Sequence, residues 1–119
     1  MIGNDTGRKG EQLAKKLLLE KGLRFIASNF TFKKLEIDLV FEDKNSKEII
    51  FVEVKTRSSL EFGLPEQSVD EKKISNLRSA ASVFIKLNPV FKSYKIRFDV
   101  VSVLKSKDDF TLNYYINAF

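Results

Sequence analysis

The order of apolar and polar positions predicts two helices and five strands. An apolar stripe at helical spacing runs through residues 10–21, and Gly22 suits the position just after a helix end. Five segments have the alternating or continuous apolar character of strands: 23–30, 35–42, 48–56, 95–104 and 111–117. With a second helix before the last two strands, the order is α-β-β-β-α-β-β. This order predicts an α/β fold with a central mixed sheet flanked by helices.

The second helix is expected to begin with a capping box, in which Ser68 is the N-cap and Glu71 the third helical residue. It is expected to end before Asn88 and Pro89. Its inward positions are Ile74, Leu77, Ala81 and Phe84. Asp99 interrupts an apolar strand, and a buried, hydrogen-bonded structural role is expected for it. No linker or repeat divides the chain, so residues 1–119 are expected to form a single domain.

The polar turn at residues 43–47 fixes the predicted register of the hairpin between the second and third strands. If the turn is centred near Asn45 and Ser46, paired positions sum to about 91, so Asp38 faces Glu53. Like charges directly opposite each other destabilise a sheet, which gives this pair a reason to hold a cation. The same alternation places four apolar residues on one face: Leu35, Ile37, Leu39 and Phe41.

Composition narrows the chemistry, because the chain has no Cys and no His. A disulfide framework, the usual zinc sites, a thiol nucleophile and a histidine base are therefore excluded. A bound metal would take oxygen ligands, which favours Mg²⁺ or Mn²⁺. No apolar run approaches membrane-spanning length and the first ten residues lack a signal-peptide core, so the expectation is a cytoplasmic protein with no membrane partner.

The net charge of +5 is concentrated in the first 34 residues, which hold eight Lys or Arg against three acids. Arg8 and Lys9 belong to this basic third, which is suited to a polyanion such as nucleic acid. On charge alone, a solvated lysine-rich helix face is an equally good interpretation.

Four residues carry the candidate chemistry. Asp38 and Glu53 would hold a divalent cation, and Lys55, two residues beyond Glu53 on the same strand face, would position the nucleophile and stabilise charge on phosphate. Glu11 lies at the edge of the buried face of the first helix, where it could be a third ligand. A carboxylate in a first helical turn is also explained by the helix dipole, and Glu53-Val54-Lys55 alone by a strand emerging into solvent.

Five segments in this order resemble the bacterial YraN family: Gly10-Glu11, Asn29-Phe30, Glu36-Ile37-Asp38-Leu39-Val40, Phe51-Val52-Glu53-Val54-Lys55-Thr56-Arg57 and Phe98-Asp99-Val100-Val101. That family looks like the restriction-endonuclease-like superfamily and is closest in layout to Holliday-junction resolvases. The resemblance implies a metal-dependent nuclease core with Glu11, Asp38, Glu53 and Lys55 at the motif positions. It also implies DNA contacts from nearby residues, namely Arg57, Ser58, Lys72 and Lys73, and a homodimer.

The sequence therefore supports an endonuclease that uses Mg²⁺ or Mn²⁺ on branched or structured DNA. The alternative is a non-catalytic nucleic-acid-binding module on the same fold, whose binding is salt-sensitive and needs no metal. A weaker third hypothesis is a protein-interaction domain that uses exposed Phe side chains.

Overall fold

The computed structural model describes residues 2–58 and 70–119, with side chains from residue 6 onward. Its elements follow the predicted order: α1 (Ile2–Glu20), β1 (Arg24–Phe32), β2 (Leu35–Asp43), β3 (Glu48–Ser58), α2 (Glu71–Leu87), the 3₁₀ turn η2 (Pro89–Phe91), β4 (Lys95–Ser106) and β5 (Asp109–Tyr115). The α-β-β-β-α-β-β arrangement around a mixed sheet is therefore confirmed.

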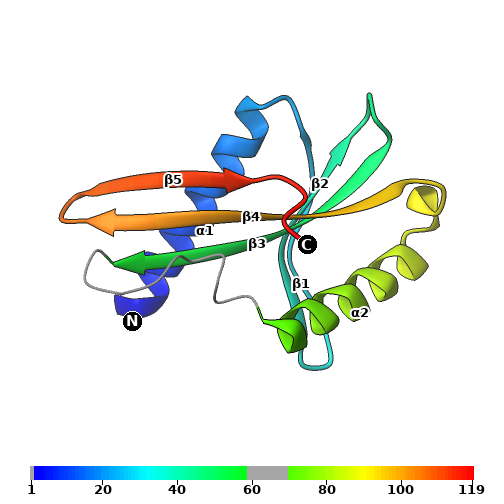
Figure 1. Ribbon diagram of the computed structural model, residues 1–119, viewed down its shortest axis with the longest axis horizontal. Helices are drawn as coiled ribbons and strands as arrows, with labels where there is room; N and C mark the ends of the chain where they lie inside the picture. The colour runs from blue at the N-terminus through cyan, green and yellow to red at the C-terminus, as the bar shows by residue number, and fades with distance from the viewer. Residues whose placement is uncertain (1, 59–69) are drawn as a thin grey trace.

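The sheet has the order β1-β2-β3-β4-β5, with β3 at its centre. Strands β3 and β4 pair in parallel and the other neighbours pair antiparallel. A parallel pair needs a long crossover connection, and α2 lies within it. Figure 1 shows α1 behind the sheet and α2 in front, so the two helices cover opposite faces.

Each helix packs on a separate hydrophobic core, one on each face of the sheet. The core under α2 consists of Ile37, Val40, Ile49, Phe51, Leu77, Ala80, Ala81, Phe84, Phe91 and Phe98. The core under α1 consists of Ala14, Leu18, Leu39, Phe41, Ile50, Val52, Val101 and Val103. Successive β3 residues from 49 to 52 alternate between the two cores, so this strand is buried on both faces, as its apolar sequence predicted.

Helix α1 begins earlier than the predicted range 10–21, at Ile2. Glycines at positions 3, 7 and 10 lower the local helix propensity, so the sequence did not predict the first turns of this helix. Its end was predicted correctly: Gly22 has a φ of 87° and follows the last turn. No helix in the described segments is long and apolar enough to cross a membrane.

The N-cap of α2 is Asp70, so the predicted capping box is wrong. The Asp70 carboxylate accepts a hydrogen bond from the backbone N–H of Lys73 at 2.9 Å. Aspartate caps a helix as well as serine does, and Asp70 lies directly before the first helical residue, Glu71. Ser68 and most of the predicted loop at 58–65 lie outside the described residues. The helix ends at Leu87, as predicted, and of its four expected inward residues Leu77, Ala81 and Phe84 are buried.

Candidate active site

The β2–β3 ladder stops where the charged residues begin. Its five pairs run from Asp43↔Glu48 to Leu39↔Val52, which confirms the predicted register. The expected next pair, Asp38 with Glu53, is not part of the ladder. Instead the Asp38 side chain accepts a hydrogen bond from the backbone N–H of Val54 at 2.8 Å. The Asp38 carboxylate of β2 thus accepts the hydrogen bond that a backbone carbonyl of β2 would accept if the ladder continued.

This change also breaks the side-chain alternation of β2. Leu35 and Ile37 pack with the core under α2, whereas Leu39 and Phe41 pack with the core under α1. The prediction that all four share one face is therefore wrong. Opposite the break, Asn29 of β1 has a φ of 52°, a left-handed conformation that asparagine tolerates better than most residues.

Glu53 is the most buried acidic group of the site, with 5% of its surface exposed. Its Oε1 lies 3.7 Å from Lys55 Nζ, and its Oε2 lies 3.6 Å from Lys73 Nζ. Oε2 is buried and accepts no hydrogen bond from the described residues. A buried carboxylate oxygen without a hydrogen-bond donor is costly, and a cation or a donor would relieve that cost.

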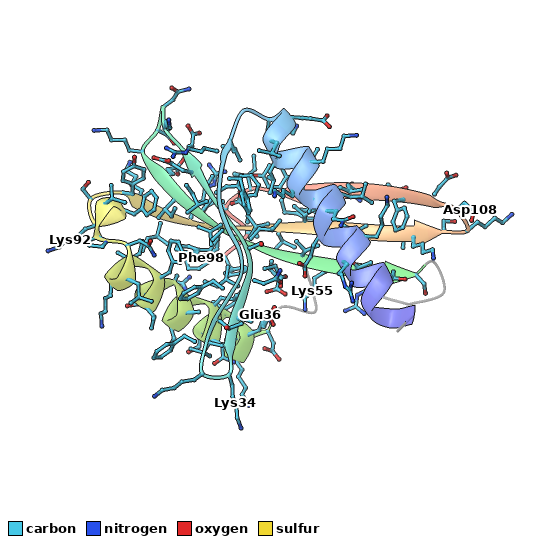
Figure 2. The ribbon with its side chains drawn as sticks, turned by 180° about the vertical axis from the view of Figure 1, so that it is seen from behind. Lys34, Glu36, Lys55, Lys92, Phe98 and Asp108 are labelled. Carbon is cyan, nitrogen blue, oxygen red and sulfur yellow. The ribbon has the colours of Figure 1, made fainter. Side chains whose placement is uncertain are left out.

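Asp38 and Glu53 interact strongly. Burial, then the negative charge of Glu53, raise the pKa of Asp38 to about 7, while the Val54 N–H and the Lys73 ammonium oppose the rise. The exposed Glu36 adds a smaller repulsion. Figure 2 labels Glu36 and Lys55 in this region, where β2, β3 and the first turn of α2 meet. Burial and neighbouring negative charge therefore both oppose ionisation of Asp38.

Glu11 approaches the same charges from α1. Burial raises its pKa, and the carboxylates of Asp38 and Glu36 raise it further, whereas a hydrogen bond with the Asn29 side chain lowers it. Over the described parts of the chain, no three acidic side chains lie close enough together to hold a metal ion. Mg²⁺ is commonly held by one or two carboxylates and completed by water and phosphate, so metal binding by Asp38 and Glu53 alone stays a prediction. A metal-binding role for Glu11 stays a prediction.

Gly10 allows α1 to approach the site closely. A Cβ atom at this position would lie 2.1 Å from Oγ1 of Thr56, the residue after Lys55 on β3. Such a contact is impossible without a shift of the helix or the strand. The absence of a side chain at Gly10 therefore sets the distance between α1 and the end of β3, and it places Glu11 beside the sheet.

Comparison with known proteins identifies the family. A profile described as "Uncharacterised protein family UPF0102" matches residues 10–103. The chain belongs to this family. It is 42% identical over 118 residues to a UPF0102 protein of Syntrophomonas wolfei, across 99% of this chain and all of that one. It is 37% identical to a UPF0102 protein of Flavobacterium psychrophilum (98% and 94% covered) and 41% identical to one of Caldanaerobacter subterraneus (96% and 93% covered).

Membership of UPF0102 agrees with the family resemblance seen in the sequence. The family match spans Gly10, Glu11, Asp38, Glu53 and Lys55, so every predicted catalytic position lies inside it. The structure brings four charged groups together by ion pairing or repulsion: Asp38, Glu53, Lys55 and Lys73.

The other predicted nucleic-acid contacts of this UPF0102 chain lie on α1, at the end of β3 and at the start of α2. Arg8 and Lys9 are exposed on α1 directly before Gly10. Arg57 and Ser58 are half-buried at the end of β3, where they pair in register with Leu104 and Lys105 of β4. Lys72 is exposed in the first turn of α2. Their contact with nucleic acid stays a prediction.

Sequence reasoning missed two parts of the site. It placed Lys73 among the DNA contacts, whereas the structure pairs it with Glu53. It also missed the hydrogen bond from Val54 to Asp38. Asn29 was a usable signal for the break in β2, because asparagine within an apolar strand often marks a left-handed residue.

Asp99 lies outside this site. Its carboxylate is fully buried and accepts hydrogen bonds from Arg97 at 2.9 and 3.0 Å, from the Tyr114 hydroxyl and from the backbone N–H of Asn117. These donors tie β4 to β5 and to the C-terminal segment. The expected structural role of Asp99 is confirmed.

Proposed function

We propose that this protein is a nuclease that hydrolyses phosphodiester bonds in branched or structured DNA with Mg²⁺ or Mn²⁺. The observation that carries the proposal is the burial of Asp38 and Glu53 together where the β2–β3 ladder ends. A fold gains no stability from two repelling buried carboxylates, so their juxtaposition is better explained by a cation that they bind.

The residues present fit such a metal. Glu53 has a buried oxygen that accepts no hydrogen bond from the described residues, and burial together with the negative charge of Glu53 raises the pKa of Asp38. Both groups offer the hard oxygen ligands that Mg²⁺ and Mn²⁺ prefer. A bound metal would polarise the scissile phosphate and lower the pKa of an attacking water.

The lysines would act on the phosphate. The Lys55 ammonium, 3.7 Å from Glu53 Oε1, is held where it can orient a phosphate oxygen and stabilise the negative charge that builds up during attack. Asp38 is fixed by its hydrogen bond from Val54, which keeps one oxygen engaged and leaves the other for a ligand. Exposed Arg8, Lys9 and Lys72 would hold the DNA backbone without reading sequence.

A second candidate function is nucleic-acid binding without cleavage. The observation that favours it is that Glu53 already pairs with Lys55 and Lys73, so its charge is partly balanced without metal. In that case the acidic pair would be structural, and the surrounding cations would bind phosphate in a salt-dependent manner.

The deciding experiment compares wild type with Glu53→Gln on labelled four-way junction, fork and duplex DNA, with Mg²⁺ or Mn²⁺. Exposed Glu20→Gln on α1 serves as the matched control, because it makes the same chemical change away from the site. The nuclease predicts metal-dependent products from wild type and Glu20→Gln and none from Glu53→Gln, with binding retained in all three. Binding without products in every protein would establish the second candidate. Sedimentation of the same samples tests whether the active form is a homodimer, which would present two sites to a junction.

A further inference from the structure

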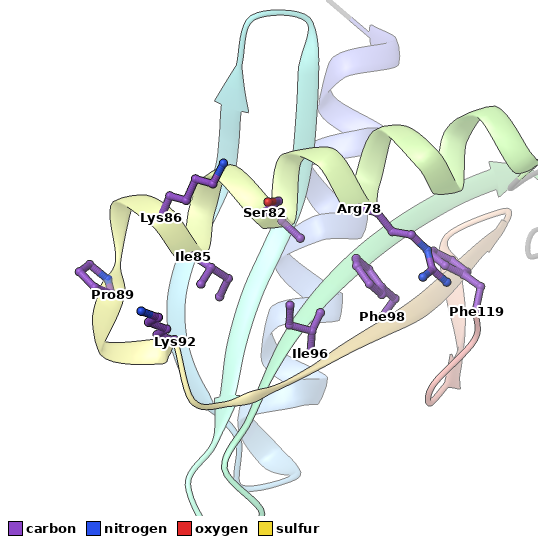
Figure 3. A pocket seen from close by; sticks show the side chains of 10 residues that line it. Arg78, Ser82, Ile85, Lys86, Pro89, Lys92, Ile96, Phe98 and Phe119 are labelled. Atoms are coloured by element: carbon purple, nitrogen blue, oxygen red, sulfur yellow. The ribbon is translucent and has the colours of Figure 1, made fainter.

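A groove of about 740 Å³ lies between the C-terminal half of α2, the start of η2 and the first residues of β4 (Figure 3). Its floor is apolar and consists of Ala81, Ile85, Ile96, Phe98 and Phe119. The rings of Phe98 and Phe119 stack with centroids 5.5 Å apart. The volume is in the range that holds a ligand or several side chains of a partner.

Large apolar side chains are exposed on and beside this groove. Ile96, near the start of β4, is 49% exposed. Leu87, which follows the lining residue Lys86 at the end of α2, is 65% exposed. A surface on which several large apolar side chains are exposed together is a binding site for another molecule more often than an average surface is.

The charged residues that line the groove are all cationic: Arg78, Lys86 and Lys92. Figure 3 shows Arg78 at one end beside Phe119, and Lys86 and Lys92 at the other, with Ile85 and Ile96 between them. Within the described part of the chain none of the three forms an ion pair. Positive charge therefore brackets an apolar centre.

We propose that this groove binds a segment of an acidic partner protein, in which apolar side chains are flanked on both sides by carboxylates. The apolar residues would cover Ile85 and Ile96, and the flanking acids would pair with Arg78 at one end and with the lysines at the other. The inference stands apart from the nuclease proposal, because the lining of the groove includes none of the residues assigned to that site.

Charge and shape favour this occupant over two others. A second copy of this basic chain docked symmetrically would set the three cations against the same three cations. Nucleic acid would satisfy the cations, but the two aromatic rings of the groove are already engaged, because Phe98 is buried and stacks on the half-buried Phe119. The large apolar side chain that the groove exposes is the aliphatic Ile96, which offers bases no surface for stacking. A protein segment can supply apolar side chains for the floor of the groove and carboxylates for Arg78, Lys86 and Lys92.

The test uses fluorescent synthetic peptides of about twelve residues, with leucine and phenylalanine at the centre and glutamates on both sides. One matched peptide replaces the glutamates with lysines, and another replaces the apolar centre with serines. By fluorescence polarisation, the first peptide should bind the full chain at least about tenfold more tightly than either control. Equal binding of the charge-reversed peptide, or no binding of the acidic one, would overturn the proposal.

Variants of the protein locate the binding. Ile96→Asp and the double variant Lys86→Glu/Lys92→Glu should each weaken binding about tenfold or more. The double variant Lys16→Glu/Lys21→Glu on the α1 side changes the net charge equally and should leave binding unchanged. Ser82→Tyr, at an exposed rim position, crowds the groove without changing charge and should also weaken binding. Circular dichroism and thermal unfolding confirm that each variant is folded.

Three results would contradict the assignment. Peptide binding that survives both Ile96→Asp and Ser82→Tyr would place the peptide elsewhere. Sedimentation that shows a dimer abolished by Ile96→Asp would assign the groove to a second copy. Displacement of the peptide by single-stranded oligonucleotide, with oligonucleotide binding lost in Ile96→Asp, would assign it to nucleic acid.

Discussion

The carboxylate of Asp38 accepts a hydrogen bond from the backbone N–H of Val54, 2.8 Å away on the next strand. A side chain thus occupies the position that a backbone carbonyl holds in the rest of the β2–β3 ladder. The bond fixes Asp38 close to Glu53, whose negative charge adds to the effect of burial in raising the pKa of Asp38.

The stability of the metal-free protein should fall as the pH rises toward neutrality. The pKa of Asp38 is raised from 3.8 to about 7 by burial and by Glu53, so the folded state retains a proton that the unfolded state has lost. Its contribution is complete below about pH 4 and is lost as the pH rises through about 7, at up to ~1.4 kcal/mol per pH unit. Urea unfolding in a chelator across this range measures the slope.

Asp38→Asn is the test of that slope, because the amide oxygen can still accept the hydrogen bond from Val54. This variant should be less pH-dependent than wild type and more stable near pH 8, by roughly 1–3 kcal/mol. Exposed Asp109→Asn on β5 is the control and should keep the wild-type slope. Identical profiles for Asp38→Asn and wild type would show that Asp38 does not titrate in this range.

Divalent metal should stabilise the fold through the same carboxylates. A ligand at about ten times its Kd adds ~1.4 kcal/mol to the free energy of unfolding, so Mn²⁺ should raise the melting temperature of wild type. Because Asp38 must release its proton to bind metal, the rise should be larger near pH 8 than near pH 6. Calorimetric scans with and without Mn²⁺ measure it.

Glu53→Gln should lose most of that thermal shift, whereas Glu20→Gln should keep it. A shift of equal size in wild type and Glu53→Gln would mean that the metal binds elsewhere on the chain. Such a result would also count against the proposed nuclease.

Two glycines of α1 should respond in opposite directions to the same substitution. Gly10→Ala should destabilise the protein by ~1–3 kcal/mol, because the new methyl group would lie 2.1 Å from Thr56 Oγ1. Gly7→Ala meets nothing within 4 Å and should stabilise it by about 0.5–1 kcal/mol through helix propensity. Chemical denaturation of both variants makes the comparison.

Thr56→Ala should recover part of the loss in Gly10→Ala, because it removes the nearest atom and leaves a Cβ contact of 3.3 Å. A double-mutant cycle measures this coupling. Additive effects would show that the two residues do not determine the helix-to-strand distance.

The buried Asp99 network should be far more sensitive than an exposed carboxylate. Asp99→Ala removes the acceptor of the Tyr114 hydroxyl and one of the two carboxylates that pair with the Arg97 guanidinium, which keeps Glu48, and should cost ~3–5 kcal/mol. Asp109→Ala, on the exposed surface of β5, should cost less than about 0.5 kcal/mol. If the variant does not fold, Tyr114→Phe removes the hydrogen bond that the hydroxyl donates to Asp99 and the one that it accepts from Arg97, and should still cost about 1–2 kcal/mol.

The sequence predicted the sheet better than it predicted the details of the site. The turn at 43–47 and the apolar runs on both sides determine the β2–β3 register, because a slip by one residue would expose every core side chain. The start of α1 was not predictable from propensity, since its first half contains three glycines and is held by the contact of Gly10 with β3. The pairing of Lys73 with Glu53 depends on how α2 packs, which local sequence does not encode.

Strand β2 contributes to both hydrophobic layers, and its break at Asp38 lies between a residue of one layer and a residue of the other. Leu35 and Ile37 lie under α2, and Leu39 and Phe41 lie under α1. Neither helix can therefore detach without disturbing the strand that the other helix covers. The charged residues lie where β2 passes from one layer to the other, so the two layers should unfold together as a single cooperative unit. The backbone amide of Val54, which donates to Asp38, should then exchange its hydrogen with solvent only when both layers open.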